Sequence, residues 1–286
     1  MKLLQIYFCG VKSEKFKKMD YIVLIGFASA VLIGVSLGLI GGGGSILTVP
    51  VLVYILGIEP VLATAYSLFV VGSTSLVGSF TYMKKGLVNY KTALVFAIPS
   101  FIAVFLTRKF LVPALPDQLF EIGEWAISKN IGIMIFFALI MLAASYSMIK
   151  GGGKKDAEED SEVKFNIPLI ALEGMVVGVI TGIVGAGGGF LIIPALVLLA
   201  RLPMKMAVGT SLLIIAAKSL IGFLGDVSSQ TIDWKMLLIF TGLSIVGIFI
   251  GSSLSKKIND KVLKKGFGWF VLVMGIYIIS KELLSL

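Results

Sequence analysis

The chain has 286 residues, of which 57% are hydrophobic and 14% are charged, and its mean hydropathy is +1.02. These proportions leave too few polar residues to cover a water-soluble surface, so the chain is expected in a lipid bilayer. The net charge of +9 does not indicate nucleic-acid binding, because Lys and Arg accumulate in membrane-protein loops for topological reasons and no soluble domain carries a basic face.

Apolar runs of about 20 residues, the length of a helix that crosses a bilayer, recur along the whole chain. The long runs are residues 21–41, 61–83, 91–112, 130–149, 167–186, 205–225, 235–254 and 266–284, and shorter runs lie at 46–57 and 190–200. The strands of a transmembrane barrel instead alternate apolar and polar residues. The expected fold class is therefore an all-α polytopic membrane protein.

The chain is predicted to contain two tandem homologous repeats. Residues 34–94 align with residues 178–238 without a gap at a constant offset of 144, and 18 of the 61 aligned positions are identical. Each repeat is expected to have about four full spans plus one short broken or re-entrant helix. The predicted organisation is a basic N-terminal leader at 1–20, repeat 1 at 21–149, a hydrophilic linker at 150–165 and repeat 2 at 166–286.

The relative orientation of the repeats depends on whether the short segments cross the membrane. Without them each half has four crossings and the halves are parallel, whereas with them each half has five and the halves are inverted. The inverted arrangement places four basic stretches on the inner side, as the positive-inside rule requires, but it puts the basic leader outside. These stretches are Lys84–Lys85, Lys150 to Lys155, Arg201 to Lys205 and Lys256 to Lys265. We therefore predict inverted repeats.

Both halves carry a glycine cluster that is followed by a proline. The clusters are Gly41, Gly42, Gly43 and Gly44, followed by Ser45 and Pro50, and Gly185, Gly187, Gly188 and Gly189, followed by Pro194. Such clusters at membrane depth are costly unless the freed backbone groups line a cavity. We predict helix breaks here, marked by the two prolines, with helix N-termini that point N–H groups at an anion. The alternative is that the glycines only allow close helix packing.

The glycine-and-proline signature continues in both halves with Ala63 and Ser67-Leu68, and with Ala207 and Ser211-Leu212. In this respect residues 20 to 285 resemble the TauE/SafE family of membrane proteins. The resemblance implies a secondary carrier that moves sulfur-containing anions such as sulfite, sulfoacetate or other organosulfonates, usually outward. Two departures, Ala186 in the second cluster and Arg201 in place of the first half's Gly57, indicate that the halves need not contribute equally.

Hydroxyl and charged residues inside the spans are the remaining candidates for a substrate site. Lys218 lies in the middle of an apolar run, with Ser211 and Thr210 two helical turns before it on the same face. Ser67 and Thr74 have the corresponding places in the first half, and all five residues are predicted to bind the substrate. Glu173 is the carboxylate best placed to carry a proton. Lys218 and Glu173 either form a structural ion pair or act directly in binding and proton coupling.

No enzyme, cofactor or metal site is predicted. The chain has no histidine, the commonest general base, and no phosphate-binding loop that ends in Gly-Lys-Ser/Thr. The expected partners are a small sulfur-containing anion, the lipid bilayer, protons and further copies in a homo-oligomer, and the expected location is the cell membrane. The alternatives are a channel-like anion facilitator and a membrane scaffold or assembly factor that transports nothing.

Overall fold

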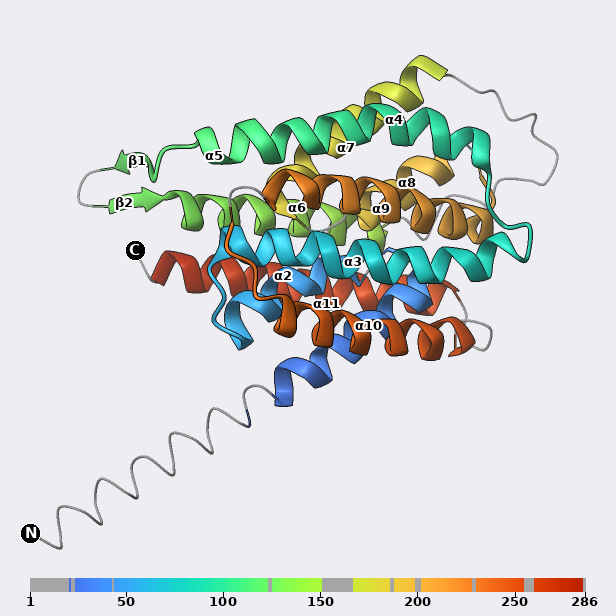
Figure 1. Ribbon diagram of the computed structural model, residues 1–286, viewed down its shortest axis with the longest axis horizontal. Helices are drawn as coiled ribbons and strands as arrows, with labels where there is room; N and C mark the ends of the chain where they lie inside the picture. Colours follow the sequence, from blue (N-terminus) through green and yellow to red (C-terminus); the bar gives the residue numbers. More distant parts are fainter. Residues whose placement is uncertain are drawn as a thin grey trace, which may run out of the picture.

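The computed structural model describes Tyr21 and residues 24–42, 44–122, 125–150, 167–185, 188–198, 202–227, 230–254 and 260–284. The predicted leader, nearly all of the linker, and the two glycines Gly43 and Gly187 lie outside these residues. Figure 1 shows the long helices lying side by side along the long axis of the molecule.

Helices occupy all ten apolar runs of the sequence. The first half has a helix at Leu24–Ile40, then α2 (Ser45–Pro50), η1 (Val51–Ile55), α3 (Pro60–Met83), α4 (Tyr90–Leu106), η2 (Thr107–Leu111), α5 (Val112–Ala114) and α6 (Lys129–Lys150). The second half has α7 (Ile167–Val184), α8 (Gly189–Leu198), α9 (Met204–Asp226), α10 (Trp234–Leu254) and α11 (Asp260–Leu284). The segments η1 and η2 are short π-helices.

A small β-hairpin departs from the expected all-α fold. Strands β1 (Gln118–Ile122) and β2 (Trp125–Ser128) pair in antiparallel register between α5 and α6. The sequence analysis did not predict these strands, because segments of five and four residues are too short for a clear alternating pattern. The architecture is thus nearly all helical.

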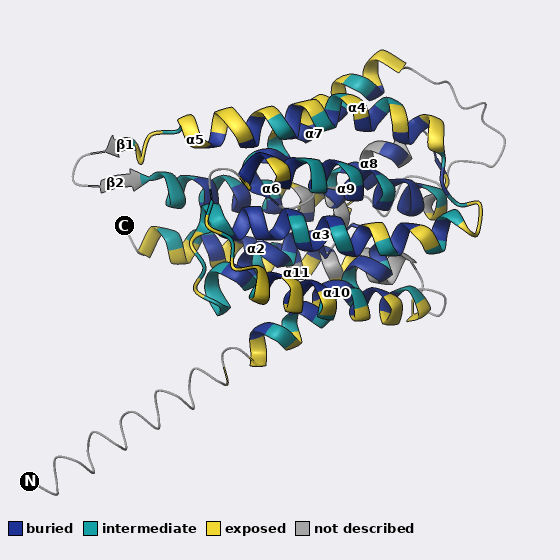
Figure 2. Cartoon of the chain, in the orientation of Figure 1, coloured by how far each residue is buried: buried dark blue, intermediate teal, exposed yellow. Residues whose placement is uncertain are grey.

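The outer faces of the helices are apolar, which is the opposite of a soluble protein. On α4 a stripe at four-residue spacing is 47–62% exposed, namely Leu94, Ile98, Ile102 and Leu106. The inner face of α4 instead carries small and polar residues such as Ala97 and Ser100, which are buried. Figure 2 shows exposed residues along the outer sides of α4 and α10. This distribution fits lipid outside and helix packing inside.

Five helices are long and apolar enough to cross a membrane, in the part of the chain that the structure describes. They cover Pro60–Lys84, Tyr90–Ala114, Ile167–Val184, Lys205–Asp226 and Trp234–Leu254. Shorter apolar helices lie at Leu24–Ile40, Ser45–Ile55 and Lys129–Ala143. The protein is therefore a multi-pass membrane protein.

The central helices α3 and α9 run in opposite directions. A methyl group at Gly72 of α3 would lie 2.9 Å from Leu220 of α9, and one at Gly78 would lie 3.6 Å from Leu212. From the first contact to the second, the residue number increases on α3 and decreases on α9. Since α3 and α9 belong to the two aligned stretches, corresponding helices of the two halves are antiparallel at this contact.

The first helix of each half packs against a helix of the other half. A methyl group at Gly34 would lie 2.8 Å from the carbonyl carbon of Ser244 on α10, and one at Gly178 of α7 would lie 2.6 Å from the carbonyl oxygen of Ser100 on α4. Gly34 and Gly178 are 144 residues apart, and so are Ser100 and Ser244. The same glycine-to-serine crossing thus occurs twice, and glycine permits the close approach of the two backbones.

Candidate functional site

The two glycine clusters touch each other in the interior. A methyl group at Gly42 would lie 2.7 Å from the Cα of Gly189, and one at Gly189 would lie 2.8 Å from the carbonyl oxygen of Gly42. Both glycines are buried. The contact therefore joins backbone to backbone, without a side chain between the two halves.

Each cluster also has a glycine that no other residue could replace without strain. Gly41 has φ of 75° and Gly185 has φ of 71°, in the left-handed region that favours glycine. A methyl group at Gly41 would lie 3.0 Å from the Cβ of Val208, and one at Gly185 would lie 2.5 Å from the Cα of Thr64. Thr64 and Val208 are themselves 144 residues apart, so they occupy equivalent positions in the two halves. The glycine cluster of each half therefore packs against this position in the other half.

The helix that follows the first cluster has fewer free donors than the sequence suggested. The N–H groups of Ser45 and Leu47 donate to the carbonyls of Gly42 and Gly44, at 3.3 and 3.1 Å. The hydroxyl of Ser45 also donates to the carbonyl of Gly42, at 2.7 Å. Before α8 the carbonyl of Gly188 accepts two N–H groups of the helix in a similar way. Part of the predicted anion-binding backbone therefore serves the turns themselves.

The prolines differ in their effect on the helices. Pro50 is the last residue of α2, which continues as the π-helix η1. Pro194 lies inside α8, which runs on to Leu198. Proline lacks an N–H group and removes one helical hydrogen bond, but the backbone leaves the helical conformation at Gly41 and Gly185, where φ is positive. Pro194 therefore does not mark a helix break.

Two of the predicted hydroxyl groups bond to the backbone of the other half. The hydroxyl of Ser211 donates to the carbonyl of Gly41 at 3.0 Å, besides a contact within its own helix. The Thr210 hydroxyl accepts the N–H of Asn89 at 2.9 Å. At the position corresponding to Thr210, the Tyr66 hydroxyl accepts the N–H of Asp233 at 2.6 Å. These groups hold the halves together.

Other buried hydroxyls have no hydrogen-bond partner among the residues that the structure describes. Four of them are Ser67 and Thr74, which the sequence analysis selected, together with Ser75 and Ser219, which it did not. All four are fully buried. Ser75 and Ser219 correspond to each other at the offset of 144, which was a signal available in the sequence. Buried polar groups normally have partners, so these hydroxyls are candidates for contact with water or substrate.

Lys218 is a buried cation that donates a hydrogen bond to a hydroxyl group. The side chain is 1% exposed, and its Nζ donates to the Oγ1 of Thr181 on α7 at 3.0 Å. A methyl group at Gly188 would lie 2.6 Å from this nitrogen, so the second glycine cluster makes room for the ammonium group.

Glu173 does not form the ion pair with Lys218 that was one of the alternatives. Within the part of the chain that is described, these two side chains make no salt bridge with each other. Glu173 lies on α7 eight residues before Thr181, which is about 12 Å of helix rise, and it is half-buried. The carboxylate therefore lies well away from the ammonium group along the helix.

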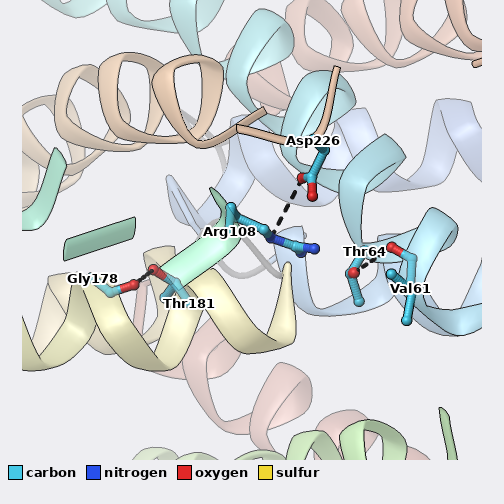
Figure 3. Close-up of polar contacts among 6 residues, drawn as sticks. All are labelled: Val61, Thr64, Arg108, Gly178, Thr181 and Asp226. Atoms are coloured by element: carbon cyan, nitrogen blue, oxygen red, sulfur yellow. Dashed lines mark hydrogen bonds and ion pairs between the residues drawn. The ribbon is translucent and has the colours of Figure 1, made fainter. Parts of the chain in front are cut away.

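A second buried cation was missed by the sequence analysis. Arg108 is 0% exposed, and its Nε lies 3.5 Å from the Oδ2 of Asp226 at the end of α9. Figure 3 shows the guanidinium group extending from η2 toward Thr64 on α3. Arg108 falls inside the apolar run 91–112, four residues after Val104 and eight after Ser100. This spacing places it on the buried face of α4, and it could have been noticed.

An apolar hollow lies beside this polar centre, and Thr107 is one of its lining residues. It has a volume of about 450 Å³ and lies between α4 and α7, where Ile98, Ile102 and Met175 are among its lining residues. None of the predicted site residues lines it. Its walls suit a hydrocarbon chain rather than an anion, so the candidate site is the buried polar centre.

The fold and the site define a class of protein. This is a multi-pass helical membrane protein whose interior holds two buried cations beside paired glycine turns. The chain matches the Sulfite exporter TauE/SafE family over residues 26–278 and belongs to that family.

Relatives from several organisms match most of the chain. It is 29% identical over 268 residues to a "Probable membrane transporter protein" of Xylella fastidiosa (strain 9a5c), covering 92% of this chain and 97% of the relative. It is 26% identical over 281 residues to "Probable membrane transporter protein YunE" of Bacillus subtilis (strain 168), covering 93% and 100%. No solved structure matches the chain.

Proposed function

We propose that this protein is a secondary transporter that exports small sulfur-containing anions such as sulfite, sulfoacetate or other organosulfonates. The observation that carries the proposal is Lys218, an ammonium group that is 1% exposed and bonded to the hydroxyl of Thr181. A charge held within a membrane bundle costs about 2.5–3.5 kcal/mol on insertion scales, and such residues mark ion and substrate pathways. The family match supports transport of a sulfur oxyanion.

The transporter is built from two inverted repeats around the glycine contact. The antiparallel packing of α3 and α9 supports this arrangement, because corresponding elements of inverted repeats run in opposite directions. The glycine contacts that recur at the offset of 144 support it as well. In transporters of this kind, the substrate lies at the repeat interface and each side opens in turn.

Glu173 carries the proton that couples transport to the proton gradient. It is half-buried on α7, the helix that also contributes Thr181 to the Lys218 contact. The two charges act separately, because no ion pair joins them within the described residues. Protonation of Glu173 and anion binding at Lys218 are linked through the position of α7.

Flux into proteoliposomes separates the proposal from its two alternatives. The purified full-length protein is reconstituted, and uptake of sulfite and sulfoacetate is measured at two imposed pH gradients, with acetate as the carboxylate control. A coupled carrier concentrates the sulfur anion, and accumulation increases with the gradient. A channel-like facilitator only equilibrates the anion, and a scaffold produces no flux above empty liposomes.

A further inference from the structure

Arg108 is held in the interior with most of its hydrogen-bonding capacity unused. A guanidinium group has five N–H donors, and this one makes a single 3.5 Å ion-pair contact with Asp226. The nitrogens Nη1 and Nη2 have no hydrogen-bond partner among the described residues, although the side chain is 0% exposed. A buried cation in this condition needs an acceptor that the described residues do not supply.

The surrounding backbone is arranged to place Arg108 there. The π-helix η2 begins at Thr107, directly after α4, and leads into α5. Such π segments are frequent at functional sites. A methyl group at Gly225 of α9 would lie 3.0 Å from the Cβ of Arg108, and one at Gly182 of α7 would lie 2.8 Å from the Cβ of Thr107. Two glycines therefore let α7 and α9 close around the base of this side chain, while the neighbouring Lys109 is exposed.

A purely stabilising ion pair does not account for this geometry. Strong Arg–carboxylate pairs are bidentate, with contacts near 2.7–2.9 Å, whereas the contact between Arg108 and Asp226 is single and 3.5 Å long. A buried pair with poor geometry does not recover the cost of removing both charges from water, and apolar residues of similar size are often as stable.

We propose that Arg108 is a direct ligand of the transported anion, and that Asp226 is its counter-ion in the empty carrier. This inference rests on the proposed function and assigns the substrate site within it. The planar guanidinium group pairs with two oxygens of a sulfite or sulfonate group. The anion displaces the carboxylate of Asp226 from Arg108, so that the empty site never holds an uncompensated charge.

Lys218 and Thr107, the residue before Arg108, contact adjacent residues of α7. Thr181 accepts the hydrogen bond of Lys218, and the next residue, Gly182, packs against Thr107. Sulfite and a sulfonate group each have three oxygens, so two can bind the guanidinium group of Arg108 while the third is available to the ammonium group of Lys218. This arrangement favours a sulfonate or sulfite over a carboxylate, which has two oxygens only.

Four variants of the full-length protein test the assignment. They are Arg108→Gln, Asp226→Asn, the double variant of both, and Lys109→Gln as the matched control, since Lys109 is the exposed neighbour of Arg108. Binding of sulfite, sulfoacetate, sulfate and acetate is measured by calorimetry in detergent, and flux is measured in proteoliposomes. Thermal unfolding of each variant shows whether it is folded.

The proposal predicts a different result for each variant. Arg108→Gln weakens sulfite binding by about 10- to 100-fold, the effect of losing a hydrogen-bonded charge, whereas Lys109→Gln leaves it unchanged. Asp226→Asn tightens sulfite binding by about 3- to 10-fold, because the anion no longer competes with a charged carboxylate for Arg108. The double variant stays folded, with an unchanged or higher unfolding temperature, and still binds weakly.

The outcomes separate this inference from the proposed function. A folded double variant that binds and transports sulfite like the wild type rejects the Arg108 site and leaves the transporter in place. Arg108-dependent binding of acetate, without sulfite flux, retains the site and rejects the sulfur specificity. A wild-type protein that binds and moves none of the four anions rejects both.

Discussion

The contact between Gly42 and Gly189 allows a quantitative test of the central packing. Neither residue has a positive φ, so an alanine at either position would cause no backbone strain. Its only cost would be the steric contact of the new methyl group with the other cluster. The new methyl group at Gly42 would lie 2.7 Å from the Cα of Gly189, whereas ordinary van der Waals contact begins near 3.4 Å. The two clusters would have to separate by the difference of 0.7 Å.

This separation is expected to be destabilising, because backbone meets backbone and no flexible side chain can give way. Overpacking a well-packed interior costs about 1–3 kcal/mol of unfolding free energy. In a chain of this size, each kcal/mol lowers the unfolding temperature by about 2–4 °C. Gly42→Ala and Gly189→Ala should each lower the unfolding temperature by about 2–12 °C. The two changes together should cost less than their sum, because both act on one contact.

Gly242 provides the matched control. It lies on the exposed face of α10, and a methyl group there would have no neighbour within 4 Å. Gly242→Ala should be neutral, or stabilising by up to about 1 kcal/mol. The measurement is thermal unfolding of the purified variants in one detergent, followed by size-exclusion chromatography. If the alanines at Gly42 and Gly189 unfold at the same temperature as the Gly242 variant, the two clusters do not touch as described.

Three further predictions address the polar residues. Lys218→Met should lower sulfite affinity more than tenfold, which corresponds to about 1.4 kcal/mol of binding free energy. It should not lower the unfolding temperature, because the substitution removes a buried charge. Unchanged affinity would exclude a role of Lys218 in binding. Glu173→Gln should bind sulfite normally and lose the response of flux to the pH gradient; an intact response would remove Glu173 from coupling. Tyr66→Phe and Thr210→Val should each cost about 1–3 kcal/mol of stability, because each leaves one backbone N–H unsatisfied; clearly unequal costs would contradict their equivalence in the two halves.

The positions of the helices were predictable because the signal is local. Each apolar run of the sequence contains a helix, since a lipid-exposed backbone must satisfy its own hydrogen bonds. The glycine turns were also indicated by composition, and Gly41 and Gly185 have the positive φ that requires glycine. The hairpin of β1 and β2 was not predictable in this way, because its pairing joins residues across a turn and its strands are short.

The charged residues show where sequence reasoning failed. Arg108 and Lys109 stand side by side near the end of an apolar run, as interfacial anchors commonly do, yet one is buried and the other exposed. Successive residues of a helix point in directions about 100° apart, so the two side chains meet different surroundings. Lys218 was matched with Glu173 because acids are scarce in the spans, but the helix rotation brings Thr181 to the ammonium group instead. Partners across helices depend on rotation and depth, which hydropathy does not encode.

Each of these charges occurs in only one of the two halves, within a frame that otherwise recurs in both. At the offset of 144, Lys218 corresponds to Thr74, Arg108 to Ser252 and Asp226 to Tyr82, whereas the glycine contacts occur in both halves. A full duplication would bring four cations and only two carboxylates into one interior. Two like charges about 10 Å apart repel by about 1.7 kcal/mol at an effective dielectric constant of about 20, and four cations form six such pairs. Glycines can be duplicated without this repulsion, so the frame can repeat while the anion site cannot.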